Sequence, residues 1–300
     1  MNKIYRDKVE LLLRVIPVIY SEESFAMHGG TAINLFVNDL LRYSVDIDLT
    51  YVPLESRDDS LRHINEALLR IAEKVKSTLK GVRIIPRLDI CKLTLEYRGR
   101  QIKIEVNQTK RGVVGGTPLT LHLSEKAQDD FEMDVKMRIV PLTLLYGGKI
   151  AAALSRQHPR DLFDIKHMSI PLSEAKYGFI FCLLGSDRPL FESFAPHLID
   201  QSEAMVNQFD GMSEIPFSYD DFTRTREKLI RDINDVLAPE DKKFLLDFER
   251  ADPDWQNSPY AEFENYPSVK WKLLNLSKLK KSNPLKLDEN VGKLKSIFGM

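Results

Sequence analysis

Two short stretches decide the fold: HGGT at positions 28–31 and RYSVDIDL at positions 42–49. In the first, Gly29 and Gly30 stand where a brief strand signal gives way to a helix signal. In the second, Asp46 and Asp48 lie one residue apart in an alternating pattern, so a strand places both side chains on one face. A glycine turn followed by paired carboxylates is the pattern expected where a protein holds a nucleoside triphosphate on a divalent metal ion.

Around these stretches the first half of the chain predicts a mixed α and β structure. Apolar spacing predicts helices over residues 4–20 and 60–79, and a helix over 32–41 with Thr31 as its N-cap. Strands are expected at 24–28, 45–51, 83–86, 91–97 and 101–107, with a hairpin turn at 98–100. Hairpin connections of this kind exclude a doubly wound parallel sheet.

From Pro141 onward the pattern becomes helical. Helices are expected at 142–156, 161–169, 172–184, 222–237 and 239–249, with long loops at 185–196 and 251–267. The sequence therefore predicts an α+β fold with a mixed sheet in the N-terminal half, a mainly helical C-terminal half and a boundary near residue 140.

Composition places the chain in a broad class. It has 300 residues, 43% of them hydrophobic and 29% charged, which is ordinary for a globular protein. Cys91 and Cys182 fit neither a disulfide framework nor a zinc pattern, so both are expected to be buried reduced thiols. We find no basic and apolar leader and no apolar run long enough to cross a bilayer, and these features predict a cytoplasmic protein without a membrane association.

The charge is unevenly distributed along the chain. Residues 200–264 carry 17 acidic and 7 basic side chains, whereas residues 270–300 carry 8 lysines against Asp288 and Glu289. The basic end is either a solvated polar tail or a contact surface for phosphates or nucleic acid. With Arg98 and Arg100, it is where contacts with RNA are to be sought.

The candidate chemistry of the first half is metal and phosphate binding. Asp46 and Asp48 can both ligate one Mg²⁺, which takes one or two carboxylates together with substrate phosphates. The glycine turn at a strand-to-helix junction offers free amides to a phosphate. Glu105 lies on the polar side of a strand in KIEVN, positions 103–107, so it can face the same cleft as a third metal ligand or as a base.

A second dense segment lies at positions 147–165. Lys149 and Arg156 lie on one side of a helix, which Pro159 ends, and Asp161 and Asp164 follow one turn apart. A lysine beside triphosphate oxygens neutralises charge that grows in the transition state, and Arg156 or Arg160 can do the same. The alternative is a surface lysine and a local ion pair between Arg160 and Asp164.

Together these motifs carry a resemblance. GGTA at 29–32, RxSxDIDL at 42–49, KIEVN at 103–107 and KIAAALSRQHPRDLFDI at 149–165 resemble the AbiEii-type nucleotidyltransferase toxins, relatives of the MenT toxins in the DNA polymerase β-like superfamily. DKKFLLDF at 241–248, PDW at 253–255 and VKWKL at 269–273 resemble the C-terminal region of that family. One departure is visible, since the superfamily commonly has Gly-Ser where this chain has Gly29-Gly30-Thr31.

The resemblance implies a polymerase β-like nucleotidyltransferase core in residues 1–140 and a helical domain in residues 141–300 that completes the nucleotide cleft. It implies transfer of a nucleoside monophosphate from an NTP to an acceptor, with Mg²⁺ or Mn²⁺ held by Asp46, Asp48 and Glu105. The implied catalytic residues are Asp46, Asp48, Glu105, Lys149 and Asp161. The implied nucleotide-binding residues are Gly29, Gly30, Thr31, Ser44, Lys149, Arg156, Arg160 and Asp164.

The expected acceptor is RNA, in particular the 3′ end of tRNA, and the expected partners are an NTP and a cognate antitoxin whose direct contact is open. Two alternatives remain. A nucleotidyltransferase that modifies a small molecule, such as an aminoglycoside, would share this chemistry with another acceptor. A non-catalytic nucleotide-binding or interaction module is less compatible with the chain, because Asp46, Asp48, Glu105 and Lys149 are all present.

Overall fold

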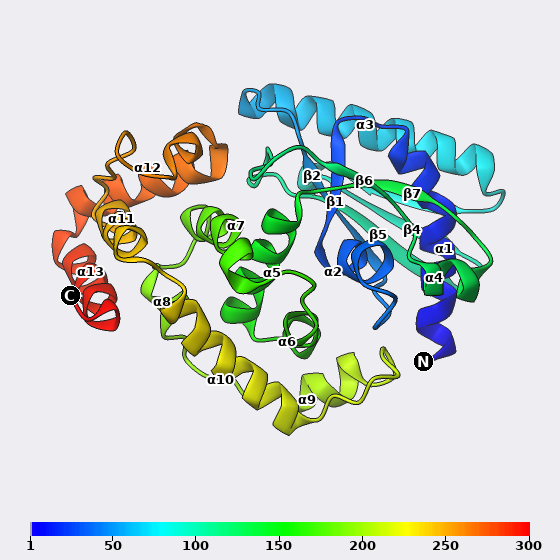
Figure 1. The fold of residues 1–300 in the computed structure, drawn as a ribbon. Coiled ribbons are helices and arrows are strands. Elements are labelled where there is room, and N and C mark those ends of the chain that lie inside the picture. Colours follow the sequence, from blue (N-terminus) through cyan, green and yellow to red (C-terminus); the bar gives the residue numbers. More distant parts are fainter. Residues whose placement is uncertain (1) are drawn as a thin grey trace. The chain divides into compact units, whose positions relative to one another are not determined.

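The computed structural model describes residues 2–300 of the chain, which divide into two compact units (Figure 1). The first unit comprises the chain up to Pro141 together with Phe209–Pro216. The second comprises Leu142–Gln208 and Phe217–Met300. The short segment Phe209–Pro216 therefore returns to the first unit, which the sequence pattern does not predict.

The first unit contains a seven-stranded sheet with helices packed against it. Its elements are α1 (Lys3–Tyr20), β1 (Phe25–His28), α2 (Gly29–Ala32), the π-helix η1 (Ile33–Val37), β2 (Asp46–Tyr51), α3 (Arg57–Thr78), β3 (Arg83–Arg87), the 3₁₀-helix η2 (Leu88–Ile90), β4 (Lys92–Tyr97), β5 (Arg100–Val106), β6 (Leu119–His122), α4 (Glu125–Phe131) and β7 (Lys136–Ile139). The strand order is β3-β4-β5-β2-β1-β7-β6. Since β2 pairs in parallel with β5, and β1 with β7, while the other pairs are antiparallel, the sheet is mixed, as the sequence predicts.

Amphipathic helices form the core of this unit. In α3, Ile64, Leu68, Ile71 and Val75 recur at helical spacing and are all fully buried. Helix α1 contacts α3 and strands β5 and β7, so the two long helices lie against the sheet (Figure 1). The hairpin between β4 and β5 turns on Arg98 and Gly99, whose φ angles of 49° and 75° suit a two-residue turn of the primed type.

The helix after the glycine turn differs from the prediction of residues 32–41. It begins at Gly29, continues as the π-helix η1 and ends at Val37. Thr31 is not an N-cap but a fully buried residue within α2, because its hydroxyl bonds to the main-chain oxygen of Asp46 on β2. His28 occupies the N-cap position, without a side-chain hydrogen bond to the helix.

Strands β6 and β7, four residues each, complete the sheet and were not expected from the pattern. Strand β7 pairs with β1 through Met27 and Ile139. Each of these two strands is four residues long and carries polar or charged side chains, so its apolar pattern is weaker than that of the equally short β1, and pairing with a neighbour fixes it in the fold.

The second unit is helical throughout. Its elements are α5 (Leu142–Arg156), α6 (Pro159–Lys166), α7 (Leu172–Leu184), α8 (Phe191–Phe194), α9 (Ser202–Ala204), the π-helix η3 (Met205–Phe209), which extends one residue beyond it, α10 (Tyr219–Asp235), α11 (Pro239–Glu249), the 3₁₀-helix η4 (Ala261–Asn265), α12 (Pro267–Ser282) and α13 (Pro284–Phe298). The five helices expected from the sequence are present. The basic end of the chain folds into α12 and α13 instead of forming a tail.

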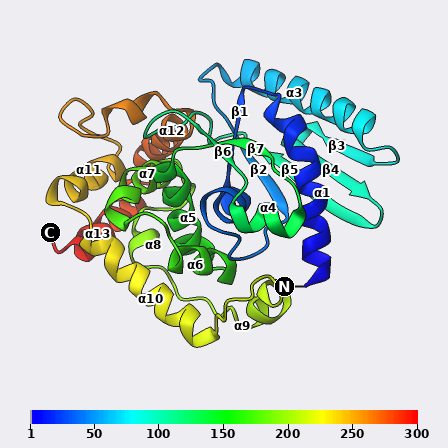
Figure 2. The same ribbon diagram turned by 45° about the vertical axis from the view of Figure 1, so that its right-hand side comes forward.

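Helices α5 and α7 cross in direct backbone contact and lie side by side in both views (Figures 1 and 2). A Cβ added at Gly147 would lie 2.2 Å from the carbonyl carbon of Gly178, and one at Gly178 would lie 2.2 Å from the main-chain oxygen of Thr143. Only glycine fits at these two positions, and the close crossing fixes the helix that carries Lys149.

Two further expectations concern the cysteines and the membrane. Cys91 and Cys182 are buried and form no disulfide, as predicted. Among residues 2–300, no helix combines the length and the apolar character that crossing a bilayer requires.

Candidate functional site

A row of polar side chains crosses four neighbouring strands of the sheet. Asp48 on β2 pairs in register with Glu105 on β5 and with His28 on β1, and Glu105 in turn pairs with Lys92 on β4. Residues directly opposite one another in a sheet point to the same face, so Asp48 and Glu105 are neighbours on one surface. Asp46 lies two residues before Asp48 and therefore shares this face.

The two carboxylates have different surroundings. Glu105 is 43% exposed and forms an ion pair with Lys92, with 2.5 Å between Oε1 and Nζ. Asp48 lies against the glycine turn, because a Cβ added at Gly29 would lie 2.5 Å from its Oδ2. Gly29 also has a φ of +80°, which side-chain-bearing residues rarely adopt. The first glycine thus allows the turn and leaves space for the carboxylate.

The second glycine leaves space for Arg42 and Ser44. A Cβ at Gly30 would lie 2.6 Å from Nη2 of Arg42 and 2.9 Å from Oγ of Ser44. Arg42 is 2% exposed, and its Nη1 donates a hydrogen bond to the main-chain oxygen of Tyr43 at 2.9 Å. The Ser44 hydroxyl is 3.1 Å from that of Thr31. All of these residues lie in the first unit.

Arg42 is a site residue that the sequence analysis quoted only as part of a motif. Its buried guanidinium brings a permanent positive charge next to the phosphate-binding candidate Gly30. The signal that could have found it is the spacing Arg42-x-Ser44-x-Asp46, since it places an arginine directly before the carboxylate strand.

In the second unit, Lys149 on α5 joins two carboxylates of α6. Its Nζ lies 3.0 Å from Oδ1 of Asp161 and 2.9 Å from Oδ2 of Asp164. The lysine is 6% exposed, and the two aspartates are 1% and 0% exposed. The alternative of a surface lysine therefore does not hold, because Lys149 is buried and engages Asp164 directly.

Arg156 extends this network toward solvent. Its Nε and Nη2 lie 2.5 Å and 3.0 Å from the two oxygens of Asp161, while 62% of its side chain is exposed. Burial by itself raises the pKa of Asp161, but the charges of Lys149 and Arg156 more than offset this, and the pKa of Asp161 lies well below its ordinary value. The carboxylate is therefore ionised wherever the protein is folded near neutral pH.

His158 sets the start of α6, which positions Asp161 in the first helical turn. Its Nδ1 accepts a hydrogen bond from the main-chain N–H of Arg160 at 3.1 Å, and its Nε2 lies 3.0 Å from Oε1 of Gln208. Burial lowers the pKa of His158, which favours the neutral ring that this cap requires. The sequence analysis missed this role, although His-Pro before a helix is a recognisable N-terminal signal.

The carboxylates of the sheet fit a divalent ion that completes its coordination with substrate. Within the described part of the chain, no group of three or more His, Cys, Asp or Glu side chains is arranged as a preformed metal cage. Asp46 and Asp48 on one strand face offer the two carboxylates that Mg²⁺ commonly uses together with phosphate oxygens and water. Glu105 is the adjacent third oxygen donor, now paired with Lys92.

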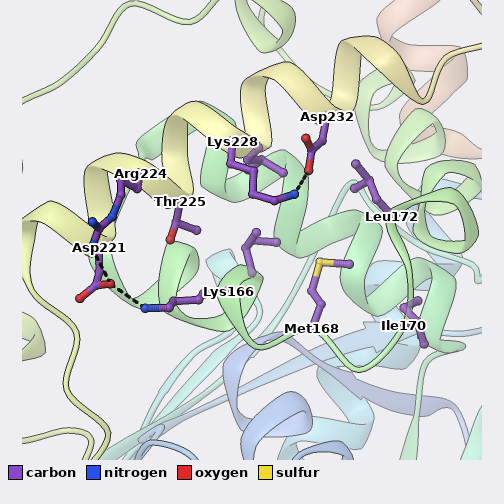
Figure 3. Close-up of a pocket in the computed structure, with 11 residues that line it drawn as sticks. Lys166, Met168, Ile170, Leu172, Asp221, Arg224, Thr225, Lys228 and Asp232 are labelled. Atoms are coloured by element: carbon purple, nitrogen blue, oxygen red, sulfur yellow. Dashed lines mark hydrogen bonds and ion pairs between the residues drawn. The ribbon is translucent and has the colours of Figure 1, made fainter.

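A cavity of about 440 Å³ lies elsewhere in the second unit, between α10 and residues 165–172 (Figure 3). Apolar and charged side chains line it together, and the charges are matched. Lys166 pairs with Asp221 at 2.8 Å, and Lys228 pairs with Asp232. The cavity contains none of the predicted site residues.

The structure thus gathers the predicted residues in two groups. The sheet group holds Asp46, Asp48, Glu105, Gly29, Gly30, Thr31 and Ser44. The helical group holds Lys149, Arg156, Asp161 and Asp164. Arg160 contributes its main-chain N–H to the start of α6.

Comparison with known proteins places this geometry in a family. No curated protein shows significant sequence similarity to the chain. Among solved structures, the chain is similar to MenT4, a nucleotidyltransferase toxin from Mycobacterium tuberculosis, with a TM-score of 0.60 and 13% identity over 92% of this chain and 95% of that one. The profile of the nucleotidyl transferase AbiEii toxins of type IV toxin–antitoxin systems matches residues 10–275. The chain belongs to the AbiEii family of nucleotidyltransferase toxins, and it is a nucleotidyltransferase.

Proposed function

We propose that this enzyme transfers a nucleoside monophosphate from an NTP to the 3′ end of an RNA, with tRNA as the acceptor. The observation that carries the proposal is the in-register pair Asp48 and Glu105 beside the Gly29-Gly30 turn. It combines carboxylates for a divalent ion with backbone amides and a buried arginine for phosphates. Family membership supports the nucleotidyl transfer itself.

In the proposed reaction, the oxygen of an RNA hydroxyl forms a bond to the α-phosphorus of the NTP. The bond from that phosphorus to the β-phosphate bridging oxygen breaks, pyrophosphate leaves, and the hydroxyl proton passes to a base. Mg²⁺ or Mn²⁺ held by Asp46 and Asp48 would supply Lewis-acid stabilisation of phosphate charge. Glu105 is the third carboxylate beside them, as a ligand or as the proton acceptor.

The proposed duties of the remaining residues follow from charge and burial. Gly29, Gly30, Thr31 and Ser44 form the phosphate-binding turn, and Arg42 is added to it on the strength of its contact with Gly30. We assign the 141–300 part to the same NTP through Lys149, Arg156 and Arg160. Asp161 and Asp164 act on Lys149 by holding its ammonium in place.

The test is transfer of label from each NTP in turn to total tRNA, with Mg²⁺ or Mn²⁺. Wild-type enzyme should label the tRNA, and Asp48→Asn should reduce the rate by at least about 100-fold, since metal stabilisation is worth several kcal/mol. Glu96→Gln is the matched control, because Glu96 is also a strand carboxylate paired across the sheet, with Arg83. Equal labelling by wild type and Asp48→Asn, or label transfer to an aminoglycoside and to no RNA, would overturn the proposal.

Because the family consists of toxins that are paired with an antitoxin, the activity can also be tested by its effect on cell growth. We propose that expression of the chain alone inhibits growth in the cytoplasm through the same reaction. Asp46→Asn should then relieve the inhibition. Inhibition that persists in Asp46→Asn with unchanged protein levels would assign the toxicity to another activity.

A further inference from the structure

Helix α12 carries an unusual exposed face. Lys270, Leu274, Lys278 and Lys281 follow one another at helical spacing, and Trp271 flanks them on the same side. Trp271 is 56% exposed and Leu274 is 47% exposed, although both are large and apolar. We define these five residues as the α12 face.

The exposure of these residues is not a sign of a poorly packed helix. The opposite side of α12 buries Val269 and Leu276, and the helix contacts α7. Lys272 on that side is also buried, and its Nζ donates to the main-chain oxygen of Arg188. The helix is therefore docked through one side, and the α12 face is left to solvent.

All charged side chains of this helix are positive. Residues 267–282 contain five lysines and no acidic residue. In the described part of the chain, no carboxylate lies within ion-pair distance of Lys270, Lys278 or Lys281, and Lys278 instead places its Nζ 5.9 Å from the ring centroid of Trp271. In α13, by contrast, Lys286 and Lys293 both pair with Glu289, at 2.9 Å and 2.7 Å.

The chemistry of the face selects its ligand. Unpaired lysines attract phosphates, and an exposed tryptophan offers a flat surface on which a nucleobase stacks. A membrane-bound helix requires a broad apolar face, whereas the apolar residues of α12 lie mostly on its buried side and leave Trp271 and Leu274 exposed. The arrangement is complementary to unpaired nucleotides of an RNA.

The other basic candidates of the sequence are less available. Arg100 forms an ion pair with Asp7 at 3.0 Å, and the ring beside Arg98, that of Tyr97, is only partly exposed. Among these basic segments, α12 has the most exposed aromatic ring, that of Trp271, and exposed lysines lie around it.

We propose that the α12 face is an RNA-docking surface, in which Lys270, Lys278 and Lys281 contact phosphates and Trp271 stacks on a base. The identification of that RNA with the acceptor rests on the proposed function, whereas the docking itself does not. The surface contributes affinity and not chemistry, so it acts on the KM for RNA and leaves the KM for NTP unchanged.

The first experiment measures binding without catalysis, in the absence of NTP and divalent metal. Trp255 packs against Phe244 and Phe248, so Trp255→Phe keeps an aromatic ring there and leaves Trp271 as the single tryptophan. Addition of tRNA, or of a 12-nucleotide single-stranded RNA, should quench the emission of Trp271. Unchanged emission with both RNAs would overturn the stacking contact.

The second experiment uses matched double variants and fluorescein-labelled tRNA. Lys278→Gln/Lys281→Gln should weaken binding and reduce the slope of log K against log salt by about 1.4 to 1.8, because each phosphate contact contributes about 0.7–0.9. Trp271→Ala should weaken binding about fivefold or more. Lys286→Gln/Lys293→Gln removes two neighbouring lysines that are neutralised by Glu289, and it should leave binding close to wild type.

Three outcomes discriminate the possibilities. Equal losses in the α12 and α13 variants would show a diffuse charge effect and overturn the assignment to this face. A response of Trp271 to phosphatidylglycerol vesicles and none to RNA would assign the face to a membrane and overturn the proposal. RNA binding that depends on the α12 face while no RNA becomes labelled would uphold the docking surface and reject the proposed function.

Discussion

Lys149 and Asp164 form a buried ion pair between α5 and α6, with 2.9 Å between Nζ and Oδ2. Because Asp161 engages the same ammonium, the removal of the lysine takes a cationic partner from two buried carboxylates at once. The pairing therefore links the stability of the helical unit to the residues proposed to bind the NTP.

The first prediction is that Lys149→Met lowers the free energy of unfolding by roughly 3–5 kcal/mol, the usual cost when one partner of a buried pair is removed. Urea denaturation measures the loss. In Lys149→Met/Asp161→Asn/Asp164→Asn, where the two carboxylate charges are also removed, much of the stability should return. A loss below about 1 kcal/mol in the single variant would show that the carboxylates find other partners.

The second prediction concerns acid stability. The pKa of Asp161 is lowered in the folded protein, so the unfolded state binds more protons as the pH falls below the ordinary value of about 4. The contribution of Asp161 to stability is therefore complete above that pH and is lost as the pH falls toward its folded pKa. Asp161→Asn should be less stable than wild type at pH 7, and urea denaturation should show the gap narrowing below about pH 4. A gap that stays constant from pH 7 to pH 3 would contradict the shift.

The third prediction separates backbone strain from the position of Asp48. Gly29→Ala and Gly81→Ala both place an alanine at positive φ, +80° and +87°, at a cost of about 1–2 kcal/mol each. Only the alanine at position 29 meets a neighbour, Oδ2 of Asp48, whereas nothing lies within 4 Å at Gly81. Both variants should lose similar stability, but only Gly29→Ala should lose nucleotidyl transfer. Equal activity of the two would show that the turn does not position Asp48.

The fourth prediction tests Glu105 through its partner. If Glu105 contributes an oxygen to the metal, Lys92 competes for it, and Lys92→Met should raise the affinity for Mn²⁺ about three- to tenfold. Glu105→Gln should lower that affinity. Isothermal titration with Mn²⁺ in the absence of NTP measures both.

Arg83→Met is the matched control for this experiment, because Arg83 forms the equivalent cross-strand pair with Glu96 at 3.2 Å in the same sheet. It should leave the affinity for Mn²⁺ unchanged. Identical Mn²⁺ binding by Lys92→Met, Glu105→Gln and wild type would exclude Glu105 as a ligand.

Five of the seven strands were predictable, the short β1 and β3 among them, and the signal was strongest where the sequence alternates over six or more residues. Strands β2, β4 and β5 have this length, and buried positions alternate with more exposed ones along most of each. The helix after Gly30 was not predicted correctly, since its end and its π-helical turn depend on Thr31 reaching across to β2, a tertiary contact that apolar spacing does not encode. Helices α12 and α13 were missed because their lysine content resembles a solvated tail, although α12 buries two apolar residues and α13 buries four.

The candidate site was predictable as a set of residue types, and not as a set of contacts. Alternation places Asp46 and Asp48 on one face, but the register that sets Asp48 beside Glu105 and Glu105 beside Lys92 is a property of the assembled sheet. The sequence places Lys149 on one helix and puts Asp161 and Asp164 one turn apart on the next. That both aspartates hold the lysine follows only from the packing of α6 against α5.

The crossing of α5 and α7 at Gly147 and Gly178 has a consequence for engineering and for the recognition of relatives. At this crossing a methyl group at either position would separate the helices, so the two sites are constrained jointly although neither takes part in chemistry. A chain that shares this crossing must keep both positions minimal in size. The pair therefore serves as a structural marker, readable in sequence, for proteins that hold the lysine of α5 in the same way.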